Sequence, residues 1–459
     1  MNMNMDFDPS MEKQVKETTD ALEKISLRIV GFKTEGLKRT KRSILSKYVT
    51  KDLADLQSFP ELYEKAYELR EKYMALDVFD DVQIELDTPP NNFYHKDSDV
   101  IMIMNFKEKN IFSLGLQGQL SSILDETSIQ ADLNLCNLMG YAENISTNIR
   151  YDVFTKSNTF GITGHFPAFP WVLDANVYKT SNNYVKQSSV YESLTGIKLV
   201  ATPPSLPAFL EQLDTHFSVF FEYVYRDLFP FRTAGMPKYE YKASQTMLNQ
   251  CRPSVKSSVG FNFNIGDMDD PVNPTIGYMF NNSLEVAGLG GDAHFVKNQS
   301  SLDIHVPLSS SYWSSCLAGH LNFSLGYLKS FGNPSLFYDR FFAENHRIRG
   351  IMTEEIGPKA NPKEGGRKTG DTLGGDILCM SSVSISSPLS SQSLQAIGAQ
   401  AHAFFNVGSI FNQMDSHDAI RNSFLYTYGF GIYIPLGGIG KIELNYLINK
   451  RKINLMFKI

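Results

Sequence analysis

The stretch Val259-Gly260-Phe261-Asn262-Phe263-Asn264-Ile265 places large apolar side chains at every second position, with small or polar residues between them. Successive side chains of a β-strand point to opposite faces, so the pattern predicts a strand with one apolar and one polar face. The same alternation recurs at 112–120, 217–226 and 452–459, and a turn-rich cluster at 266–271 follows the quoted strand. From residue 111 onward, the chain is therefore predicted to be a series of antiparallel strands.

Strict alternation of this kind has two explanations. A soluble sandwich buries its apolar face, whereas a membrane barrel turns that face to lipid and keeps polar side chains around a wet lumen. The barrel is favoured because the region lacks a convincing second helical layer and its polar face holds Ser, Asn, Gln and Gly more often than Lys and Glu. The last stretch also runs to Ile459, as expected of a closing strand. At ~10 residues per strand and ~12 per connection, the region predicts about 16 strands.

Charge is distributed unevenly along the chain. The first 110 residues hold 38 charged side chains, whereas the remaining 349 hold 54. The charge-poor part still lacks the ~20 near-continuous apolar residues that a membrane helix needs, since its longest charge-free run, 377–414, is rich in Ser, Gln and Gly. A helical membrane protein is thereby excluded. A net charge of −6 without a basic stripe argues against nucleic acid as a partner.

The charged front predicts a small α+β domain after an acidic, disordered tail at 1–23. Alternating apolar residues predict strands near 25–29, 82–86 and 100–106, and 3–4 spacing predicts a helix over 59–76. A second helical stretch runs from Thr40 to about Tyr48. This order of elements is sufficient for a domain over 24–109, with helices on one face of a three-stranded sheet.

Catalytic and metal-binding signals are weak throughout. The four cysteines form no CxxC pair and are expected to be reduced, and the nine histidines show no HExxH spacing. The stretch 365–369 lacks the spacing of a phosphate-binding loop. Asp267, Asp269 and Asp270 lie in a turn without the glycine and terminal glutamate of a calcium loop. No enzyme activity, metal or cofactor is therefore expected. Residues 1–8 contain no signal core or Arg-rich presequence, which favours synthesis without secretion.

Several motifs in the second half resemble a known family. Asp339-Arg340-Phe341 is followed by Ile348-Arg349-Gly350, then by Ile356-Gly357-Pro358 and by 370–375, Gly-Asp-Thr-Leu-Gly-Gly. Phe404-Phe405-Asn406-Val407-Gly408 matches an F-x-D-x-G strand, with Asn at the acidic position. With weaker matches such as 137–143, these motifs resemble the BamA-like family of outer-membrane β-barrel assembly factors, and more narrowly the central barrel subunit of the mitochondrial sorting and assembly machinery. The resemblance covers about residues 20–459.

The resemblance implies a fold and a function. The fold would be one POTRA (polypeptide-transport-associated) domain at 24–109, then a 16-stranded transmembrane barrel at 110–459 with a loop around 340–372 folded inside it. The function would be insertion of β-barrel precursor proteins into the mitochondrial outer membrane, with the N-terminal domain in the intermembrane space. Membrane lipid and metaxin-like subunits on the cytosolic face are the implied partners. The alternative is an outer-membrane pore for polypeptides or metabolites.

Two sites follow from this resemblance. The first is the lumen loop motif, where the guanidinium of Arg349 would donate to lumen acceptors. Its expected neighbours are Phe404, Asn406 and Gly408. Asn406 shares the non-aliphatic face of its strand with His402 and Gly408, so parity predicts that it faces inward. The motif is completed by Ile348 and Gly350, and the return of the loop by Gly370, Asp371, Gly374 and Gly375.

The second site is a lateral seam between the first and last strands. Gly115 and Gly118 weaken the first strand, because glycine adds no packing and more unfolded entropy. A weak seam could open and let a client strand pair with the exposed edge. The last strand contributes Asn454, Phe457 and Ile459, and this end also resembles the sorting signal of mitochondrial barrels, with Asn454 in place of Gly.

Overall fold

The structure is a computed structural model, in which the chain forms two units. It describes residues 28–49, 59–89, 99–121, 126–152, 157–167, 171–203, 213, 215–231, 242–270, 272–309, 317–343, 349–352, 354–365, 368–389, 391–436 and 440–458. The predicted tail at 1–23, Ile348 and Ile459 lie outside these ranges.

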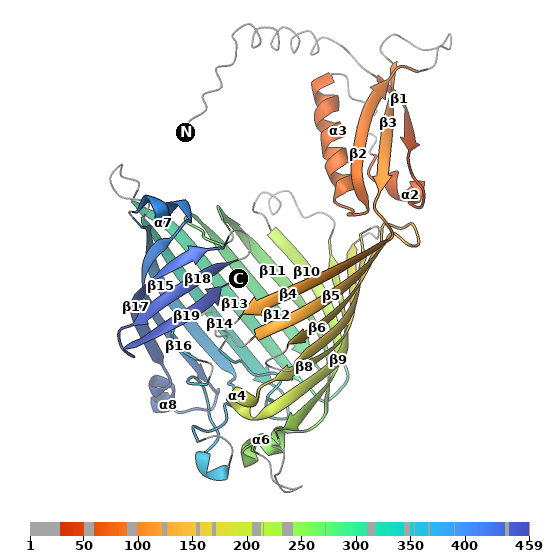
Figure 1. Ribbon diagram of the computed structural model, residues 1–459. Coiled ribbons are helices and arrows are strands. Elements are labelled where there is room, and N and C mark those ends of the chain that lie inside the picture. The colour runs from red at the N-terminus through yellow and green to blue at the C-terminus, as the bar shows by residue number, and fades with distance from the viewer. Residues whose placement is uncertain are drawn as a thin grey trace. The chain divides into compact units, whose positions relative to one another are not determined.

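Sixteen antiparallel strands form one large sheet, which confirms the predicted strand number. Each strand pairs with the strands before and after it in the sequence, so the sheet is a simple meander that curves round on itself (Figure 1). The strands are β4 (Phe112–Ser121), β5 (Glu126–Cys136), β6 (Asn144–Asp152), β7 (Asn158–Phe166), β8 (Val172–Asn183), β9 (Val190–Thr202), β10 (Thr215–Pro230), β11 (Ser254–Met268), β12 (Gly277–Ala287), β13 (Phe295–Ser309), β14 (Leu317–Ser330), β15 (Ile377–Pro388), β16 (Gln400–Phe411), β17 (Leu425–Pro435), β18 (Lys441–Leu447) and β19 (Lys452–Lys458).

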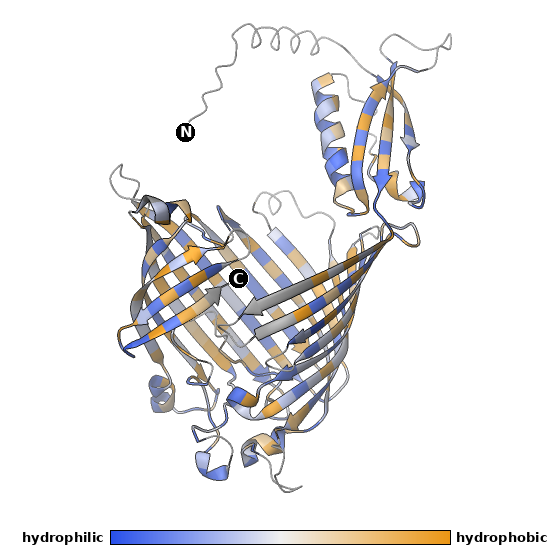
Figure 2. Cartoon of the chain, in the orientation of Figure 1, coloured by the Kyte–Doolittle hydropathy of each residue, from blue (hydrophilic) through white to orange (hydrophobic). Residues whose placement is uncertain are grey.

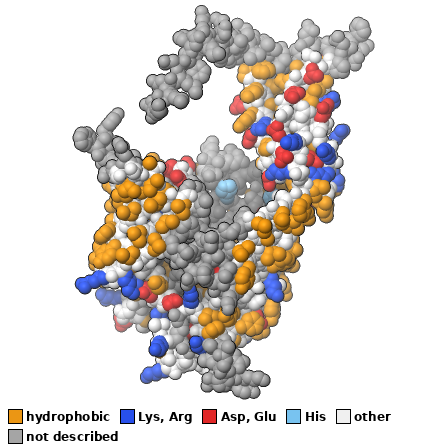
Figure 3. All heavy atoms as spheres, viewed as in Figure 1, with side chains coloured by type: hydrophobic (Ala, Val, Ile, Leu, Met, Phe, Trp, Pro, Cys, Tyr) orange, Lys and Arg blue, Asp and Glu red, His pale blue; other side chains and the backbone are white. Residues whose placement is uncertain are grey.

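The alternation in the sequence sorts side chains between the two faces of this sheet. In β16, Phe405 is 49% exposed whereas its neighbour Asn406 is completely buried, and in β15 the same contrast separates Val383 from Ser382. Figure 2 shows the resulting alternation of hydropathy along the strands, and Figure 3 shows hydrophobic side chains covering the outside of the strands that face the viewer. Exposed apolar and buried polar side chains are the inverse of a soluble sandwich and are typical of a transmembrane barrel.

The ladder ends at β4 and β19, and these two strands are not paired with each other among the described residues. The sequence predicted that the first and last strands would close the barrel, and in this respect the structure differs from the expectation. Every other strand has two neighbours, so β4 and β19 each keep one edge whose backbone groups face away from the ladder. The barrel fold is therefore present with an open seam.

Short helices lie in the connections between strands. They are α4 (Val185–Ser188), α6 (Gln245–Gln250), α7 (Gln392–Ala396), α8 (His417–Asn422) and the 3₁₀ turn η2 (Pro362–Glu364). Because alternate strands run in the same direction, α7 and the β11–β12 turn lie at one rim, here called the α7 rim. The connection containing α8 and the start of the β14–β15 connection lie at the opposite rim, the α8 rim. No helix in the described ranges is long and apolar enough to cross a membrane.

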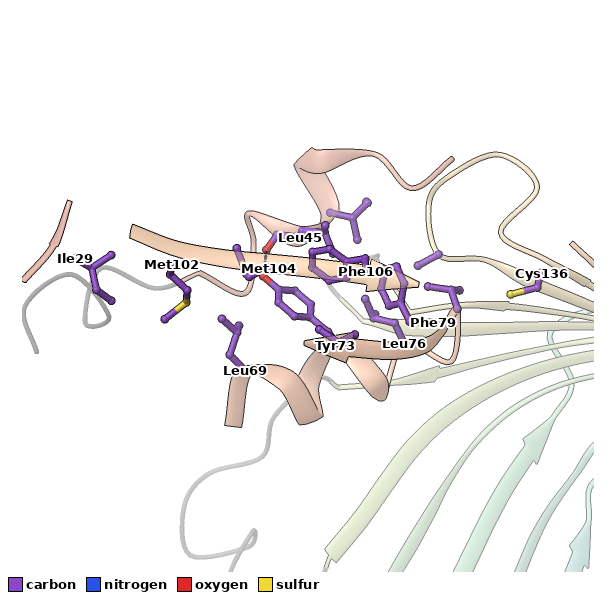
Figure 4. Close-up of a cluster of buried hydrophobic side chains, with 14 of the residues drawn as sticks. Ile29, Leu45, Leu69, Tyr73, Leu76, Phe79, Met102, Met104, Phe106 and Cys136 are labelled. Atoms are coloured by element: carbon purple, nitrogen blue, oxygen red, sulfur yellow. Dashed lines mark hydrogen bonds between the residues drawn. The ribbon is translucent and has the colours of Figure 1, made fainter. Parts of the chain in front are cut away.

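The N-terminal unit is a three-stranded sheet with two helices. The order is β1 (Arg28–Glu35), β3 (Asp99–Glu108), β2 (Phe79–Asp87), and β1 runs parallel to β3. The helix α3 (Phe59–Met74) buries Leu62, Leu69 and Tyr73. These side chains belong to one buried cluster with residues of β2 and β3, and Figure 4 shows Leu69 and Tyr73 within it. The hydroxyl of Tyr73 donates to the carbonyl of Leu45 at 3.1 Å. The small α+β region confirms the predicted class.

The first helix is shorter than its sequence pattern predicts. The pattern extends from Thr40 to Tyr48, but α2 covers only Arg42–Leu45. Thr40 does not cap the helix, because its backbone N–H and its hydroxyl both donate to the carboxylate of Glu108, at 2.9 and 2.7 Å. The strand predicted at 25–29 is described only from Arg28 onward.

The connection between β5 and β6 belongs to the N-terminal unit. Arg39 donates to the carboxylate of Glu108 and to the carbonyl of Cys136, and the side-chain amide of Asn137 donates to the hydroxyl of Thr40 at 2.7 Å. The N–H of Lys41 donates to the carbonyl of Gly140 at 3.0 Å. Burial by itself would raise the pKa of Glu108, but hydrogen bonds from Thr40, Arg39 and Lys38 outweigh it and lower that pKa to about 2. An ionised carboxylate therefore stabilises this connection.

Candidate functional site

The β14–β15 connection, 331–376, is the longest between neighbouring strands and forms the candidate site. Its apolar side chains are buried against inward-facing residues of β14, β15 and β16: Phe341, Ala343, Ile351 and Ile356 pack with Leu328, Leu378, Met380 and Ile410. Paired backbone hydrogen bonds between Phe341 and Gly375 close its base. We call this segment the lumen loop, because its contacts lie on the buried face of the strands.

The guanidinium of Arg349 forms a two-pronged ion pair with Glu443 in β18. Nε donates to Oε2 at 2.7 Å and Nη2 donates to Oε1 at 2.9 Å. Both side chains are buried, with 6% and 0% exposure. The same guanidinium lies over the ring of Phe404, 5.2 Å from its centroid. A planar guanidinium suits both contacts, since it can donate in its plane while its face stacks on a ring.

Asn406 binds the backbone of Arg349 instead of its guanidinium. The side-chain amide of Asn406 donates to the carbonyl of Arg349 at 3.1 Å, and the hydroxyl of Thr427 donates to the same oxygen at 2.6 Å. The Asn406 oxygen in turn accepts from Ser382 at 2.7 Å. The neutral Asn at this position is therefore matched to a peptide carbonyl, and the acidic partner of Arg349 comes from β18. Gly408 lies two residues after Asn406 in β16 and is the register partner of Leu425 in β17.

Gly350 permits the turn that follows Arg349. Its φ is +75°, which side chains rarely adopt, and an added Cβ would lie 2.5 Å from the methyl groups of Leu447. The carbonyl of Gly350 accepts from Lys450 Nζ at 2.8 Å. Two successive carbonyls at the tip of the lumen loop are thus held: that of Arg349 by Asn406 and Thr427, and that of Gly350 by Lys450.

A second anchor holds the returning part of the lumen loop. Asp371 is completely buried, and its carboxylate accepts from the hydroxyl of Ser189 at 2.8 Å and from the N–H of Ser244 at 2.7 Å. The next carbonyl, of Thr372, accepts from Ser188 at 2.7 Å. Gly370 has φ +81° and lies against the carbonyl of Ala360, where an added Cβ would be only 2.3 Å away. The glycines at 374 and 375 lie at the base of the loop, against Phe341 and Ile410.

A third anchor lies at the start of the lumen loop. Arg226 in β10 donates to the carboxylate of Asp339 at 2.5 Å, and both side chains are at most 5% exposed. Lys297 in β13 donates to the backbone carbonyl of Asp339 at 2.8 Å. The three anchors therefore tie one loop to β10, to the β8–β9 and β10–β11 connections, and to β16–β18.

Glu443 and Arg226 were missed in the sequence. Both are charged residues on the buried face of a strand in a region that is otherwise poor in charge. That combination is a usable signal, because an inward-facing charge in a barrel is retained only where it has a partner. The family motif includes residue 406 and contains no residue of β18.

The predicted seam residues lie on the two end strands. Gly115 and Gly118 belong to β4, and Gly115 lies against Asp132 of β5. Asn454 and Phe457 belong to β19, in register with Asn445 and Ile442 of β18. The structure therefore places these residues at the two ends of the ladder and does not bring the two groups together.

The described part of the chain contains no group of three or more His, Cys, Asp or Glu side chains arranged to hold a metal ion. Cys136, Cys251 and Cys379 are free thiols. The turn with Asp269 and Asp270 uses its carboxylates on its own backbone, since Asp269 accepts from Thr275 and Ile276, and Asp270 from Val272 and Asn273.

Comparison with known proteins places this architecture. The Sorting and assembly machinery component 50 homologs of Mus musculus and Homo sapiens are each 25% identical to the chain, over 97% of it and 89% of the relative. BamA from Haemophilus ducreyi lacking POTRA domains 1–3 shares the fold, with a TM-score of 0.72, 16% identity, and coverage of 94% of this chain and 84% of that one. The Omp85 superfamily domain matches residues 137–455, well over half of the sequence. The chain belongs to the Omp85 superfamily.

Proposed function

We propose that this protein inserts and assembles β-barrel precursor proteins in the mitochondrial outer membrane. The observation that carries the proposal is the pair of end strands, β4 and β19, each with one edge unpaired among the described residues. Unpaired backbone groups are costly in lipid, where no water is present to bind them. A precursor strand that pairs with such an edge satisfies these groups and gains its own ladder of hydrogen bonds. Insertion of this kind requires no covalent chemistry.

The relatives support the same function. The mouse and human proteins carry the name sorting and assembly machinery component, and they align with nearly the whole chain. The partners proposed on this basis are β-barrel precursors, membrane lipid and metaxin-like subunits on the cytosolic face. The N-terminal α+β unit is proposed to be a POTRA domain in the intermembrane space, and the lumen loop to hold β16–β18 in place beside the seam.

Depletion tests the proposal. In cells depleted of this protein, newly imported porin should accumulate outside the membrane-integrated pool, because no edge is available to template its strands. The measurement is the amount of imported porin that resists extraction with alkaline carbonate, followed over time. A helical outer-membrane protein imported in parallel serves as the control and should be unaffected. Normal porin assembly after complete depletion would contradict the proposal.

A further inference from the structure

The β11–β12 turn, described at 269–270 and 272–276, leaves the sheet at the α7 rim. Its backbone is shaped by Asp269, which accepts from the N–H and the hydroxyl of Thr275 at 2.8 and 2.5 Å. Asp270 accepts from the N–H of Val272 at 2.7 Å. These bonds use the acidic side chains internally, so the turn has a defined shape of its own. Pro274 at its centre is buried, although a turn at the rim of a barrel is ordinarily exposed to water.

The turn contacts a strand far from its own. The hydroxyl of Tyr433, near the end of β17, donates to the side-chain oxygen of Asn273 at 2.7 Å. Between β11 and β17 the ladder advances by six strands, which at about 4.8 Å per strand corresponds to roughly 29 Å along the wall. A turn that stayed at the rim beside β11 could not make this contact. Asn273 therefore lies across the lumen from β11, and the described residues of the turn extend inward from the α7 rim.

A polar chamber separates this turn from the tip of the lumen loop. Its volume is about 220 Å³. Val272 and Pro274 of the turn line it on one side, and Arg349 of the lumen loop lines it on another. The wall between them includes His305, His320 and His402 from β13, β14 and β16. The described residues of the turn and the tip of the lumen loop, which enter from opposite rims, thus line one shared space.

An unobstructed barrel of this size would conduct, because 16-stranded porins enclose an aqueous channel. We propose that the β11–β12 turn is a second plug, held across the lumen by the hydrogen bond between Tyr433 and Asn273, and that it blocks ions and small solutes at the α7 rim while the lumen loop occupies the other side. The plug prevents the barrel from leaking, whatever proteins it assembles. This inference is independent of the client proteins, because it concerns only passage through the lumen.

Conductance of the purified full-length protein in planar lipid bilayers tests the plug. Asn273→Ala removes the contact with Tyr433 but leaves the phenol its neighbour Gln400, whose side-chain oxygen lies 2.5 Å away, so no buried hydroxyl loses its only partner. This variant should raise the mean conductance several-fold over wild type. A second variant replaces residues 270–275 with Asn-Gly, a two-residue turn between Asp269 and Ile276 that keeps the hairpin but cannot reach β17. It should conduct still more.

Two matched variants should conduct as wild type does. Asn273→Asp keeps a side-chain oxygen that accepts from Tyr433. Asn249→Ala removes an asparagine from α6 in the connection at the opposite rim, where its side-chain oxygen accepts from Gln245, one helical turn away. Heat-dependent gel mobility confirms that each barrel is folded before recording. If Asn273→Ala and the shortened turn conduct no more than wild type, the plug proposal is wrong.

Discussion

Arg349 is bound at two chemically different points, and the division of partners follows from the chemistry of each. Its guanidinium carries a positive charge and is paired with the carboxylate of Glu443, whereas its carbonyl is neutral and receives the amide of Asn406 and the hydroxyl of Thr427. A buried charge without a counter-charge is expensive, so the ion pair matters most for what its loss would leave behind. Asn406 can donate to a carbonyl, which an ionised aspartate at the same position could not do.

Replacing Glu443 with Gln should weaken the anchoring of the lumen loop by about 3 kcal/mol, because the guanidinium of Arg349 stays buried without a counter-charge. The measurement is the midpoint of thermal unfolding, read from heat-dependent gel mobility, together with the rate of precursor assembly. Arg349→Ala should lower assembly more than it lowers barrel abundance, and the double variant should cost less than the sum of the two singles.

Glu355→Gln is the matched control for this prediction, since Glu355 contacts Lys450 at an exposed site of the same loop. Exposed pairs contribute at most about 1 kcal/mol. Equal effects of Glu443→Gln and Glu355→Gln would contradict the importance assigned to the buried pair, and a strictly additive double variant would show that Arg349 and Glu443 act separately.

For single residues, the sequence predicts which face of a strand a side chain lies on better than it predicts which group that side chain binds. Parity alone places Asn406 on the inward face, and the family resemblance draws attention to Arg349. Neither reveals that the carboxylate comes from Glu443, since a contact across 94 residues depends on the path of the lumen loop between them. Strand alternation carries no information about which of several inward polar groups a loop will reach.

The lumen loop is held to the barrel wall at three separate places, near its start, at its tip and in its returning part. Asp339 and Asp371 bind side chains and backbone at β10 and at the β8–β9 and β10–β11 connections, and Arg349 binds at β18. The bonded groups on the wall are far apart along the ladder, so the loop connects strands that have no direct contact. Loss of one anchor should loosen its own part of the loop first, because the other anchors remain.

Asp371→Asn should loosen the returning part of the lumen loop by about 1–3 kcal/mol. The amide oxygen can still accept from the N–H of Ser244, and its NH₂ group can donate to the hydroxyl of Ser189, but both bonds lose the charge of the carboxylate. Hydrogen bonds to an ionised group are about twice as strong as neutral ones. Hydrogen exchange of 368–376, measured by mass spectrometry, should become faster while exchange at Arg349–Met352 changes little. Asp415→Asn, at a carboxylate that accepts from Asn412 in another connection, should leave 368–376 protected. Unchanged exchange in Asp371→Asn would contradict this anchor.

The connection between β5 and β6 should lose its order in acid. The pKa of Glu108 is lowered from 4.5 to about 2 in the folded protein, so its ionised form contributes stability at all pH values above about 4.5. This stability is lost as the pH falls from about 4.5 towards 2. Pepsin cleavage within the connection, 137–143, should accelerate over that interval, after correction for pepsin activity on an unfolded substrate.

Glu108→Gln supplies the control for the acid prediction. Its amide retains an acceptor but carries no charge, so the variant should be less stable at neutral pH by about 2 kcal/mol and should show no extra loss between pH 4.5 and 2. If wild type and Glu108→Gln respond to acid in the same way, Glu108 is not the group responsible.

Elements with strong periodicity are predicted well, and elements defined by tertiary contacts are not. The helix α3 and the strands β2 and β3 follow their apolar spacing closely. The stretch from Thr40 to Tyr48 has helical spacing too, yet only Arg42–Leu45 is helical. Thr40 stays outside the helix because it is bound to Glu108 in a strand 68 residues away. The inward course of the β11–β12 turn also escaped prediction, since its acidic residues resemble those of any solvated turn.

For the whole molecule, the uneven charge of the sequence corresponds to its two environments. The charge-rich front forms the N-terminal α+β unit, and the charge-poor remainder forms a barrel whose outward face is apolar. Charges that remain in the barrel are concentrated in paired positions inside it, such as Arg226 with Asp339 and Lys256 between Glu222 and Glu285.

A covalent bond across the seam should stop assembly if precursors enter there. Cysteines are placed in β4, at Ser113 or Gly115, and in β19, at Asn454 or Met456, in a chain whose native cysteines are replaced by Ser. The pair that forms a disulfide on oxidation should block release of newly assembled porin, and reduction should restore it. The reason is that a precursor strand can pair with β4 or β19 only while these edges are apart.

A disulfide elsewhere in the ladder provides the comparison for the seam experiment. Leu444 and Leu455 are register partners in β18 and β19 and face outward, so cysteines at these positions join two strands that are already paired. Oxidation of this second pair should leave assembly unchanged, because it fixes no new contact across the seam. Assembly that continues with the β4–β19 bond fully formed would mean that precursors are inserted without opening of the seam. Inhibition by both disulfides would instead indicate that β19 must separate from β18 as well, which places the point of entry one strand further along the ladder.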